Sequence, residues 1–330
     1  MTCPPVSILI PCYNAAPWVG AAINSALAQT WQPLEVIVLD DGSTDDSAKV
    51  IAEFGDRIKY LQTPNRGQNP SRNKLTELST GDWLVYLDAD DEYPPDHIEK
   101  MMVHSAKADA VYSSLERAFY RENKKVDSVR ESAHDYDDTW SAAFRWKYPN
   151  TSSFMFRRSS LMEVGGWNES VQNCTDYALY FDLLLHEKQF KAAPETWTTY
   201  RQWSATQAVY ENDLRRATTR INLMWEKALA RDASNHPLTP SQRKAFGEAT
   251  FGCIRTLYQI NSTLAQEEYQ RLREWDQSWL PSGPAAPKSY RIAHAIAGFR
   301  GAERFASATR ALRKATRSHN GSHRHIAPSN

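Results

Sequence analysis

The first ninety residues alternate short apolar runs with segments whose apolar side chains recur at helical spacing. Residues 6–10 and 35–39 are continuous apolar runs, typical of parallel strands that are buried on both faces. Between them, residues 17–30 carry apolar side chains at helical spacing, which predicts a crossover helix. Further strands are predicted over residues 58–61 and 83–87. This order predicts a doubly wound α/β sheet.

The composition of the sequence divides the whole chain into four predicted parts. Residues 1–205 form the α/β part, and its strand and helix signals become mixed in its second half. From 206 to 280 the apolar residues keep helical spacing, which predicts a helical extension. Residues 281–287 are rich in proline, which is typical of a linker. Residues 288–330 are predicted to form a basic helix followed by a disordered tail.

Charge and cysteine content limit the classes of function. The 330 residues include 39 basic and 39 acidic side chains, and this balance argues against a protein whose whole surface binds nucleic acid. No stretch of about 18 apolar residues, no signal peptide and no C-x-x-C pair occur. The sequence therefore predicts a cytoplasmic protein in a reducing compartment.

The charge is nevertheless uneven along the chain. From Lys288 to the end there are nine basic residues and one acid, Glu303, which gives a net charge of +8. Apolar residues form a stripe beside these charges, at Ile292, Ala295, Ile296, Phe299, Phe305 and Leu312. This pattern favours peripheral contact with an anionic membrane. A terminal helix packed on the domain, or an arm for an acidic partner, is the alternative.

Polar clusters follow three of the predicted strands, over residues 11–14, 40–45 and 88–91. In an open parallel sheet, ligands bind outside the carboxyl ends of the strands. The cluster at 40–45 can also be explained as a turn with a helix cap. The recurrence of such clusters on several strands favours a ligand site.

The third cluster, Asp88-Ala-Asp90-Asp91, places three carboxylates within four residues. Such carboxylates repel one another unless a cation or hydrogen-bond donors compensate them. Two of them can share Mg²⁺ or Mn²⁺, which completes its shell with water and phosphate oxygens. We expect a divalent metal here; a surface acidic turn is the alternative.

Two common nucleotide-binding motifs are absent. The turn after the first strand has no G-x-G-x-x-G, and no G-x-x-x-x-G-K-[S/T] occurs in the chain. These absences argue against a dinucleotide-binding dehydrogenase and a P-loop NTPase. Tyr13 can instead stack on a flat base, and Asp40 can accept a hydrogen bond from an N–H of that base.

Taken together, the three clusters closely resemble those of the family 2 glycosyltransferases of the GT-A fold. The resemblance covers roughly residues 5–205. Further segments follow the order and spacing of the family: residues 65–67, 71–73, 165–169, 174–176 and 200–201. It implies a catalytic domain with a Rossmann-like, mostly parallel sheet and flanking helices, followed by the C-terminal helical extension.

The resemblance also implies roles for individual residues. The implied residues of the donor site are Pro11, Tyr13, Asn14, Asp40, Arg66, Arg72 and Asp88. Pro11, Tyr13 and Asn14 would line the nucleotide pocket and Asp40 would read the base, usually uracil. Asp88 would contact ribose or sugar. Asp90, together with Asp91, would meet a Mn²⁺ or Mg²⁺ that bridges the diphosphate.

Asp176 stands where the family has its general base. The family pairs two acids there, whereas this chain has Thr175-Asp176, so only the second carboxylate is kept. The family's Y-R-x-H also differs, because this chain ends that motif in Trp203, and we expect no histidine ligand. A helix N-cap is the alternative role for Asp176.

The implied reaction is the transfer of a sugar from a nucleotide-sugar donor, expected to be a UDP-sugar, with inversion. The acceptor would be a hydroxyl of a saccharide or of a lipid-linked molecule. Two alternatives stay open: a non-catalytic GT-A scaffold that binds nucleotide sugars, and a sugar nucleotidyltransferase. The nucleotidyltransferase would need a glycine-rich loop after the first strand, which this sequence lacks.

Overall fold

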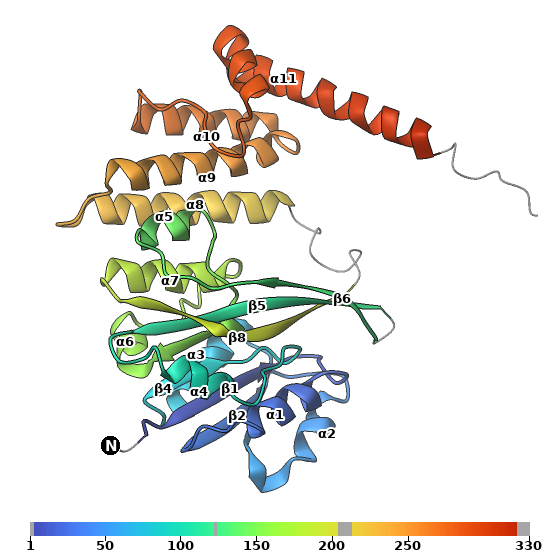
Figure 1. Cartoon of the computed structure of the whole chain (residues 1–330), viewed down its shortest axis with the longest axis vertical. Helices are drawn as coiled ribbons and strands as arrows, with labels where there is room; N and C mark the ends of the chain where they lie inside the picture. The colour runs from blue at the N-terminus through green and yellow to red at the C-terminus, as the bar shows by residue number, and fades with distance from the viewer. Residues whose placement is uncertain (1–2, 122–123, 204–212, 322–330) are drawn as a thin grey trace, which may run out of the picture. The chain divides into compact units, whose positions relative to one another are not determined.

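The computed structural model describes residues 3–121, 124–203 and 213–321 (Figure 1). The chain divides into two compact units. The first comprises residues 1–212 and 225–238, and the second comprises 213–224 and 239–330. Helix α8 (Asp213–Asp232) therefore contributes residues to both. Within the described residues, no helix is long and apolar enough to cross a membrane.

The first unit is built on one mixed sheet, which has eight strands in the described part of the chain. Its strands are β1 (Val6–Cys12), β2 (Leu34–Asp40), β3 (Lys59–Gln62), β4 (Trp83–Tyr86), β5 (Ala110–Arg121), β6 (Lys124–Glu131), β7 (Phe154–Arg157) and β8 (Phe190–Trp203). The order is β3-β2-β1-β4-β7-β5-β6, and β8 pairs with β5.

The first half of the sheet is parallel, as the sequence predicts. β1 lies between β2 and β4, with Ile8 opposite Val36 on one side and Val85 on the other. All three side chains are buried, because the parallel strands are covered on both faces. The carboxyl ends of β1, β2 and β4 therefore lie along one edge of the sheet.

The second half of the sheet is mixed. β7 is antiparallel to both β4 and β5, while β8 runs parallel to β5 along most of its length. β6 forms an antiparallel pair with the outer part of β5. The sequence predicts strands over 110–115 and 151–156, but not β6 or β8.

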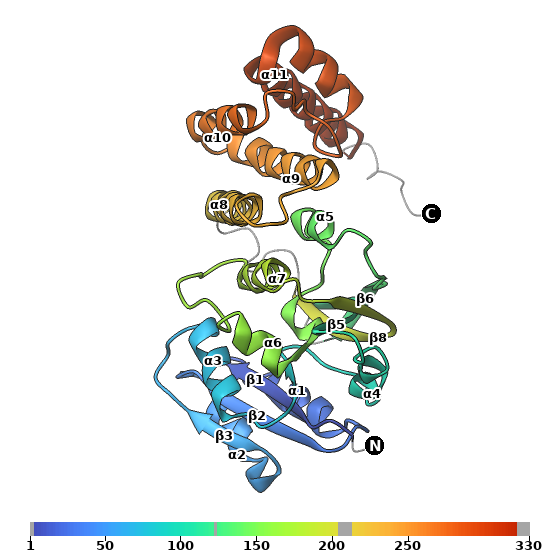
Figure 2. The ribbon, with the colours of Figure 1, turned by 90° about the vertical axis from the view of Figure 1, so that its left-hand side faces the viewer.

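Helices flank the parallel strands. Figure 2 shows α1 on one side of them and α3 on the other, as right-handed crossovers on either side of β1 require. The buried stripe of α1 comprises Val19, Ala22, Ile23 and Ala26, which is the apolar pattern seen in the sequence. The helices and 3₁₀ turns of this unit are α1 (Val19–Leu27), α2 (Ser47–Ala52), η1 (Gly55–Arg57), α3 (Gln68–Leu78), α4 (His97–Met102), α5 (Thr139–Phe144), η2 (Thr151–Ser153), α6 (Arg158–Glu163) and α7 (Thr175–Leu185).

The second unit is helical, with α9 (Pro240–Tyr258), α10 (Ser262–Trp275) and α11 (Lys288–Gly321). Helix α9 starts with a capping box in which Thr239 accepts a hydrogen bond from the Gln242 backbone. Gly298 adopts a positive φ of 64° and divides α11 into two helical segments.

The segment 281–287 does not separate two units, although its composition predicts a linker. Both 281–287 and α11 belong to the second unit. Ala286 is buried, and the Arg255 guanidinium donates a hydrogen bond to the carbonyl of Ala285. The prolines of 281–287 thus belong to a turn that packs within the second unit. The predicted disordered tail begins within α11, and its last residues, 322–330, lie outside the described residues.

Candidate active site

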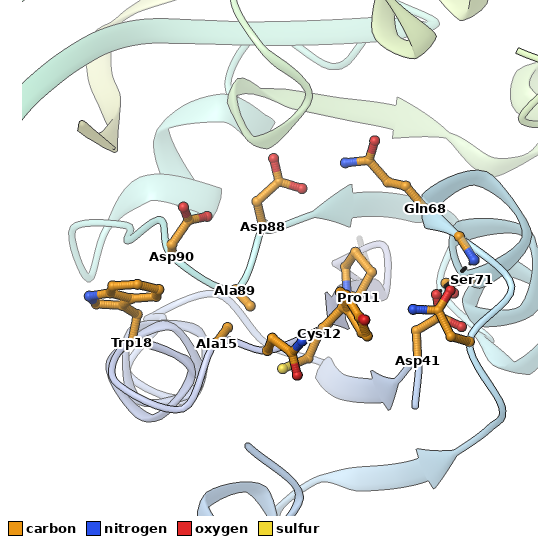
Figure 3. Close-up of a pocket in the computed structure, with 14 residues that line it drawn as sticks. Pro11, Cys12, Ala15, Trp18, Asp41, Gln68, Ser71, Asp88, Ala89 and Asp90 are labelled. Carbon is orange, nitrogen blue, oxygen red and sulfur yellow. Dashed lines mark hydrogen bonds between the residues drawn. The ribbon is translucent and has the colours of Figure 1, made fainter. Parts of the chain in front are cut away.

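A cavity of about 580 Å³ opens at the carboxyl ends of β1, β2 and β4 (Figure 3). Segments far apart in the sequence meet there, as expected at the switch point of a doubly wound sheet. Its lining residues are Pro11, Cys12, Tyr13, Asn14, Ala15, Trp18, Asp41, Asn65, Gly67, Gln68, Ser71, Asp88, Ala89 and Asp90. Of the predicted donor residues, the cavity brings together Pro11, Tyr13, Asn14 and Asp88.

The loop after β1 contributes the Tyr13 ring to the cavity wall, and its residue Asn14 forms hydrogen bonds to the loop after β2. Tyr13 is 52% exposed, so its ring is available to a ligand. Asn14 adopts a positive φ of 49°, which asparagine tolerates better than most residues. Its side-chain oxygen accepts a hydrogen bond from the Thr44 backbone N–H at 2.8 Å, and its own N–H donates to Ser43 Oγ at 2.9 Å. Asn14 thus fixes the loop that follows β2 against the loop that follows β1.

Asp40 lies at the end of β2 but does not line the cavity. Its carboxylate is fully buried and accepts hydrogen bonds from the Ser43 N–H at 2.9 Å and the Gln62 side chain at 3.1 Å. These contacts hold the turn after β2, which matches the alternative of a strand-exit turn. A role of Asp40 in reading the base stays a prediction.

The neighbouring Asp41, which the sequence reasoning did not select, does line the cavity. Its two oxygens accept hydrogen bonds from the backbone N–H groups of Arg66 and Gly67, at 2.9 and 2.8 Å. The signal in the sequence that could have pointed to Asp41 is that it directly follows Asp40. Because successive residues leave a strand on opposite sides, only one of the two carboxylates can face the cavity.

The first turn of α3 forms another part of the wall. Gly67, at a φ of 96°, precedes the helix, and Gln68 and Ser71 line the cavity from its first turn. Backbone N–H groups at a helix start favour anionic ligands. Arg66 lies outside the lining: its side chain is largely exposed and 3.9 Å from Glu169.

Two carboxylates follow β4 into the cavity. In Figure 3 the side chains of Asp88 and Asp90 project toward the same side, with the Trp18 ring beside Asp90. Burial and the charge of Asp88 raise the pKa of Asp90 to about 6. In the described part of the chain, no other side chain forms a hydrogen bond to Asp90.

Asp91, predicted as a metal ligand, points elsewhere. It is fully buried, does not line the cavity, and accepts hydrogen bonds from the Asn150 side chain at 3.2 Å and the Arg201 N–H at 3.3 Å. Burial and the charges of Asp90 and Asp88 raise its pKa. Asp91 thus links the loop after β4 to β8.

The side chains of the cavity supply only part of the ligands that a hard divalent cation needs. Among the described residues, no group of three acidic, histidine or cysteine side chains is placed to hold a metal. Asp88 and Asp90 supply carboxylate oxygens on one cavity wall, and Mg²⁺ or Mn²⁺ commonly takes its remaining ligands from water and phosphates. The residues present therefore fit a metal that binds together with a phosphorylated ligand.

Arg72 joins this wall to the start of α7. Its guanidinium is 3.0 Å from Asp88 Oδ1 and donates to Thr175 Oγ1 at 3.3 Å. The same group lies over the Trp167 ring, 4.4 Å from its centroid. Arg72 is 1% exposed and does not line the cavity. It is therefore placed to hold Asp88 in position.

Asp176 is half-buried in the first turn of α7. The residue at the N-cap position is Cys174, at a φ of 58°, and no side-chain hydrogen bond caps the helix. Asp176 is thus not the N-cap residue, but its Oδ1 accepts a hydrogen bond from the Tyr177 backbone N–H at 2.8 Å and so contributes to the helix start. Burial raises the pKa of Asp176, the nearby charge of Asp88 adds to this, and the charge of Arg72 opposes it. A raised pKa brings the carboxyl closer to the range useful to a general base.

The structure adds cavity residues that the sequence reasoning missed: Trp18, Asp41, Asn65, Gln68 and Ser71. Asn65 and Ser71 belong to segments that the resemblance to the glycosyltransferase family includes. Trp18 lies at the N-cap of α1, inside the range 17–30 for which the apolar spacing predicts a helix. Helical spacing cannot distinguish a core position from a cavity wall at the first turn.

Comparisons with known proteins find similarity to glycosyltransferases. Residues 7–165 match the family described as glycosyl transferase family 2. An uncharacterized glycosyltransferase of Rickettsia conorii is 32% identical over 197 residues, which are 57% of this chain and 32% of that protein. The chain spans about a third or less of the length of the first curated relatives that it matches.

Solved structures share the fold at low sequence identity. The structure of S. aureus TarS 1-349 in complex with UDP has a TM-score of 0.56 at 14% identity, covering 83% of this chain and 92% of that one. A mannosyltransferase from Pyrobaculum calidifontis, in complex with GDP-Man and Mn²⁺, has a TM-score of 0.53 at 17% identity, covering 90% and 88%. The predicted GT-A fold is thereby confirmed. Residues 7–165, slightly less than half of the chain, are similar to glycosyl transferase family 2.

Proposed function

We propose that this chain is a metal-assisted, inverting glycosyltransferase. It transfers a sugar from a nucleotide-sugar donor, a UDP-sugar, to a hydroxyl of a saccharide or lipid-linked acceptor. The observation that carries the proposal is the shared cavity of Asp88 and Asp90 with Tyr13 and Asp41. The carboxylates of Asp88 and Asp90 can bind a cation. The exposed ring of Tyr13 and the carboxylate of Asp41 can bind the nucleotide's base.

The donor is proposed to lie along the carboxyl edge of the sheet. Tyr13 stacks on the base, and a carboxylate at the end of β2 accepts its N–H. Asp41 supports this role better than Asp40, because only Asp41 lines the cavity. The diphosphate lies toward the first turn of α3, where backbone N–H groups favour anions. The UDP complex of TarS supports the choice of nucleotide.

The metal is proposed to bind at Asp90, with Asp88 on the same wall and the diphosphate as the remaining anchor. When bound, the cation neutralises the charge that develops on the departing diphosphate. The Mn²⁺ in the Pyrobaculum mannosyltransferase structure supports this assignment. Asp91 orients the loop that carries Asp90 through its contacts to Asn150 and Arg201.

Asp176 is proposed as the general base. An acceptor hydroxyl has a pKa near 15, so it must lose its proton as it attacks the anomeric carbon. The proton moves to the Asp176 carboxylate, the new glycosidic bond forms, and the bond to the diphosphate breaks. If attack comes from the face opposite the leaving group, one such displacement inverts the anomeric centre. A lipid-linked acceptor would bring the enzyme to the inner face of a membrane.

The proposal is tested by release of UDP from UDP-sugars with Mn²⁺, in the presence of saccharide and lipid-linked acceptors. The anomeric configuration of the product is then read from its NMR couplings. Asp90→Asn is expected to lower the turnover rate about 100-fold or more. Asp46→Asn removes an exposed acid at the start of α2 that forms no capping bond, so it serves as the matched control. Donor binding without turnover on any acceptor favours the non-catalytic scaffold.

A further inference from the structure

Helix α11 in the second unit has apolar side chains on two opposite faces. Its inner face is anchored in the unit: Tyr290 and Phe299 are buried, and the Phe299 ring stacks on Tyr269 with centroids 4.4 Å apart. The opposite face exposes Ile292 by 54% and Ile296 by 81%. A surface helix ordinarily needs only the inner stripe to pack on its domain.

The two exposed isoleucines lie one helical turn apart, so their side chains form a single patch. Beyond the bend at Gly298, Phe305 is exposed by 51%. Isolated exposed apolar residues are common, but large aliphatic and aromatic side chains exposed on both segments of α11 indicate an interaction surface. We call Ile292, Ile296 and Phe305 the outer apolar face.

Over residues 288–310 of α11, the exposed charged side chains are all positive. Lys288, Arg291, Arg300 and Arg304 are exposed. The sole acid of this part of the sequence, Glu303, is fully buried, where Arg255 pairs with it at 2.5 Å. The fold thus removes the one negative charge from the surface and leaves the positive ones at it.

We propose that α11 docks on an anionic lipid bilayer, with the outer apolar face in the acyl boundary and the basic side chains at the headgroups. This combination of faces is that of an interfacial helix. A nucleic acid would use the positive charges but give no reason for an exposed Ile296. The inference goes beyond sugar transfer and does not depend on it, because lipid binding is measured without donor or acceptor.

The test is flotation of the full chain with two kinds of vesicle, phosphatidylcholine alone and phosphatidylcholine with an equal part of phosphatidylglycerol. We expect the protein to float with the anionic vesicles and to bind neutral ones at least about tenfold more weakly. Raising the salt from about 0.15 M to about 1 M is expected to weaken the binding, because it shortens the screening length. No binding, or equal binding to both vesicles, overturns the proposal.

Two pairs of variants separate the apolar and the electrostatic parts. Ile296→Asp is expected to lower vesicle affinity at least about tenfold. Ile260→Asp, at a residue of the same unit that is 47% exposed, is expected to leave it unchanged. Arg291→Gln with Arg304→Gln is expected to lower the affinity about fivefold per charge.

The charge control is Lys244→Gln with Arg271→Gln, which removes two exposed positive charges on α9 and α10. If the control double variant weakens binding as much as the α11 variant, the surface is not the docking site. All substituted residues are exposed, so unchanged circular dichroism is expected and shows that folding is retained. If Ile296→Asp abolishes a dimer seen by light scattering but leaves lipid binding intact, a second copy covers the face and the proposal fails.

Discussion

The guanidinium of Arg72 and the carboxylate of Asp88 form an ion pair at 3.0 Å that connects two parts of the candidate site. Arg72 also donates to Thr175, the residue before the proposed base. Arg72 is almost wholly buried, whereas Asp88 lines the cavity. The ion pair therefore connects the core of the unit to the wall of the cavity. One side chain thereby sets the position of Asp88 and the electrostatic environment of Asp176.

Arg72→Met removes this charge and its hydrogen bonds. We expect the free energy of unfolding to fall by about 2 kcal/mol, the range for hydrogen bonds to charged groups. The charge of Arg72 lowers the pKa of Asp176, so its loss raises that pKa. The acid limb of the kcat–pH profile therefore moves to higher pH. Arg72→Lys keeps the charge, and its limb should stay near that of the wild type. An unshifted limb in Arg72→Met would mean that Asp176 does not govern the profile.

Asp90→Asn tests the metal assignment. The side chain keeps its shape but loses the charge that a hard cation requires. We expect kcat to fall about 100-fold or more, since the metal's charge stabilisation is worth several kcal/mol. Calorimetric titration of donor with and without Mn²⁺ checks the cause: the affinity gained from Mn²⁺ should vanish. Asp91→Asn, in contrast, should lower the melting temperature and leave Mn²⁺-dependent donor affinity largely intact.

Asp176→Asn separates the proposed base from donor binding. We expect kcat to fall by about 10²–10⁴-fold, the usual contribution of a positioned base. The donor Kd should stay within about twofold, since Asp176 does not line the cavity. Steady-state rates and donor titrations on one preparation give both numbers. Undiminished transfer would show that another group takes the proton.

Glu35 on β2 gives a prediction for stability against pH. Burial alone would raise the pKa of this carboxyl, but hydrogen bonds from Lys59, Ser7 and Thr80 outweigh it and lower the pKa to about 2. The folded pKa lies below the unfolded value, so the stabilisation is present above about pH 4.5 and is lost as the pH falls toward 2. A shift of this size corresponds to at most about 3 kcal/mol, and because Lys59 is largely exposed, solvent screening reduces the expected stabilisation at neutral pH to about 2 kcal/mol.

Glu35→Gln is therefore expected to lower the free energy of unfolding at pH 7, measured by urea titration, and to flatten its dependence on pH below 4.5. Glu53→Gln, at an exposed residue after α2, is the matched control and should change neither quantity. Equal losses for both variants at pH 7 would show that the contacts of Glu35 contribute nothing specific.

Much of the first unit could be predicted from the sequence because its signals are local. Apolar runs marked β1, β2 and β4, since strands buried on both faces leave no polar alternation. β8 was missed because residues 194–199 mix proline, threonine and an acid with a tryptophan. It is held by its long pairing with β5, whose residues lie 80 to 83 positions earlier in the chain.

The sequence predicted where on the sheet the candidate site lies more accurately than it predicted which side chains face the cavity. Acids at the ends of β2 and β4 marked the edge of the sheet, but not the direction of each side chain. Asp41 and Asp90 line the cavity, while their neighbours Asp40 and Asp91 do not line it and are hydrogen-bonded elsewhere. That choice depends on partners such as Gln62 and Asn150, which are remote in sequence.

The nucleotide-sugar donor site is tested most directly by thermal unfolding of the chain with UDP, GDP, CDP, TDP and their sugars, each with Mn²⁺, Mg²⁺ or EDTA. Selective binding stabilises the fold by about 2.7 kcal/mol at a hundredfold excess over Kd. We predict an upward shift of the melting temperature with UDP and UDP-sugars that disappears with EDTA and in Asp90→Asn. No shift with any nucleotide, in protein shown to be folded, would contradict the donor site.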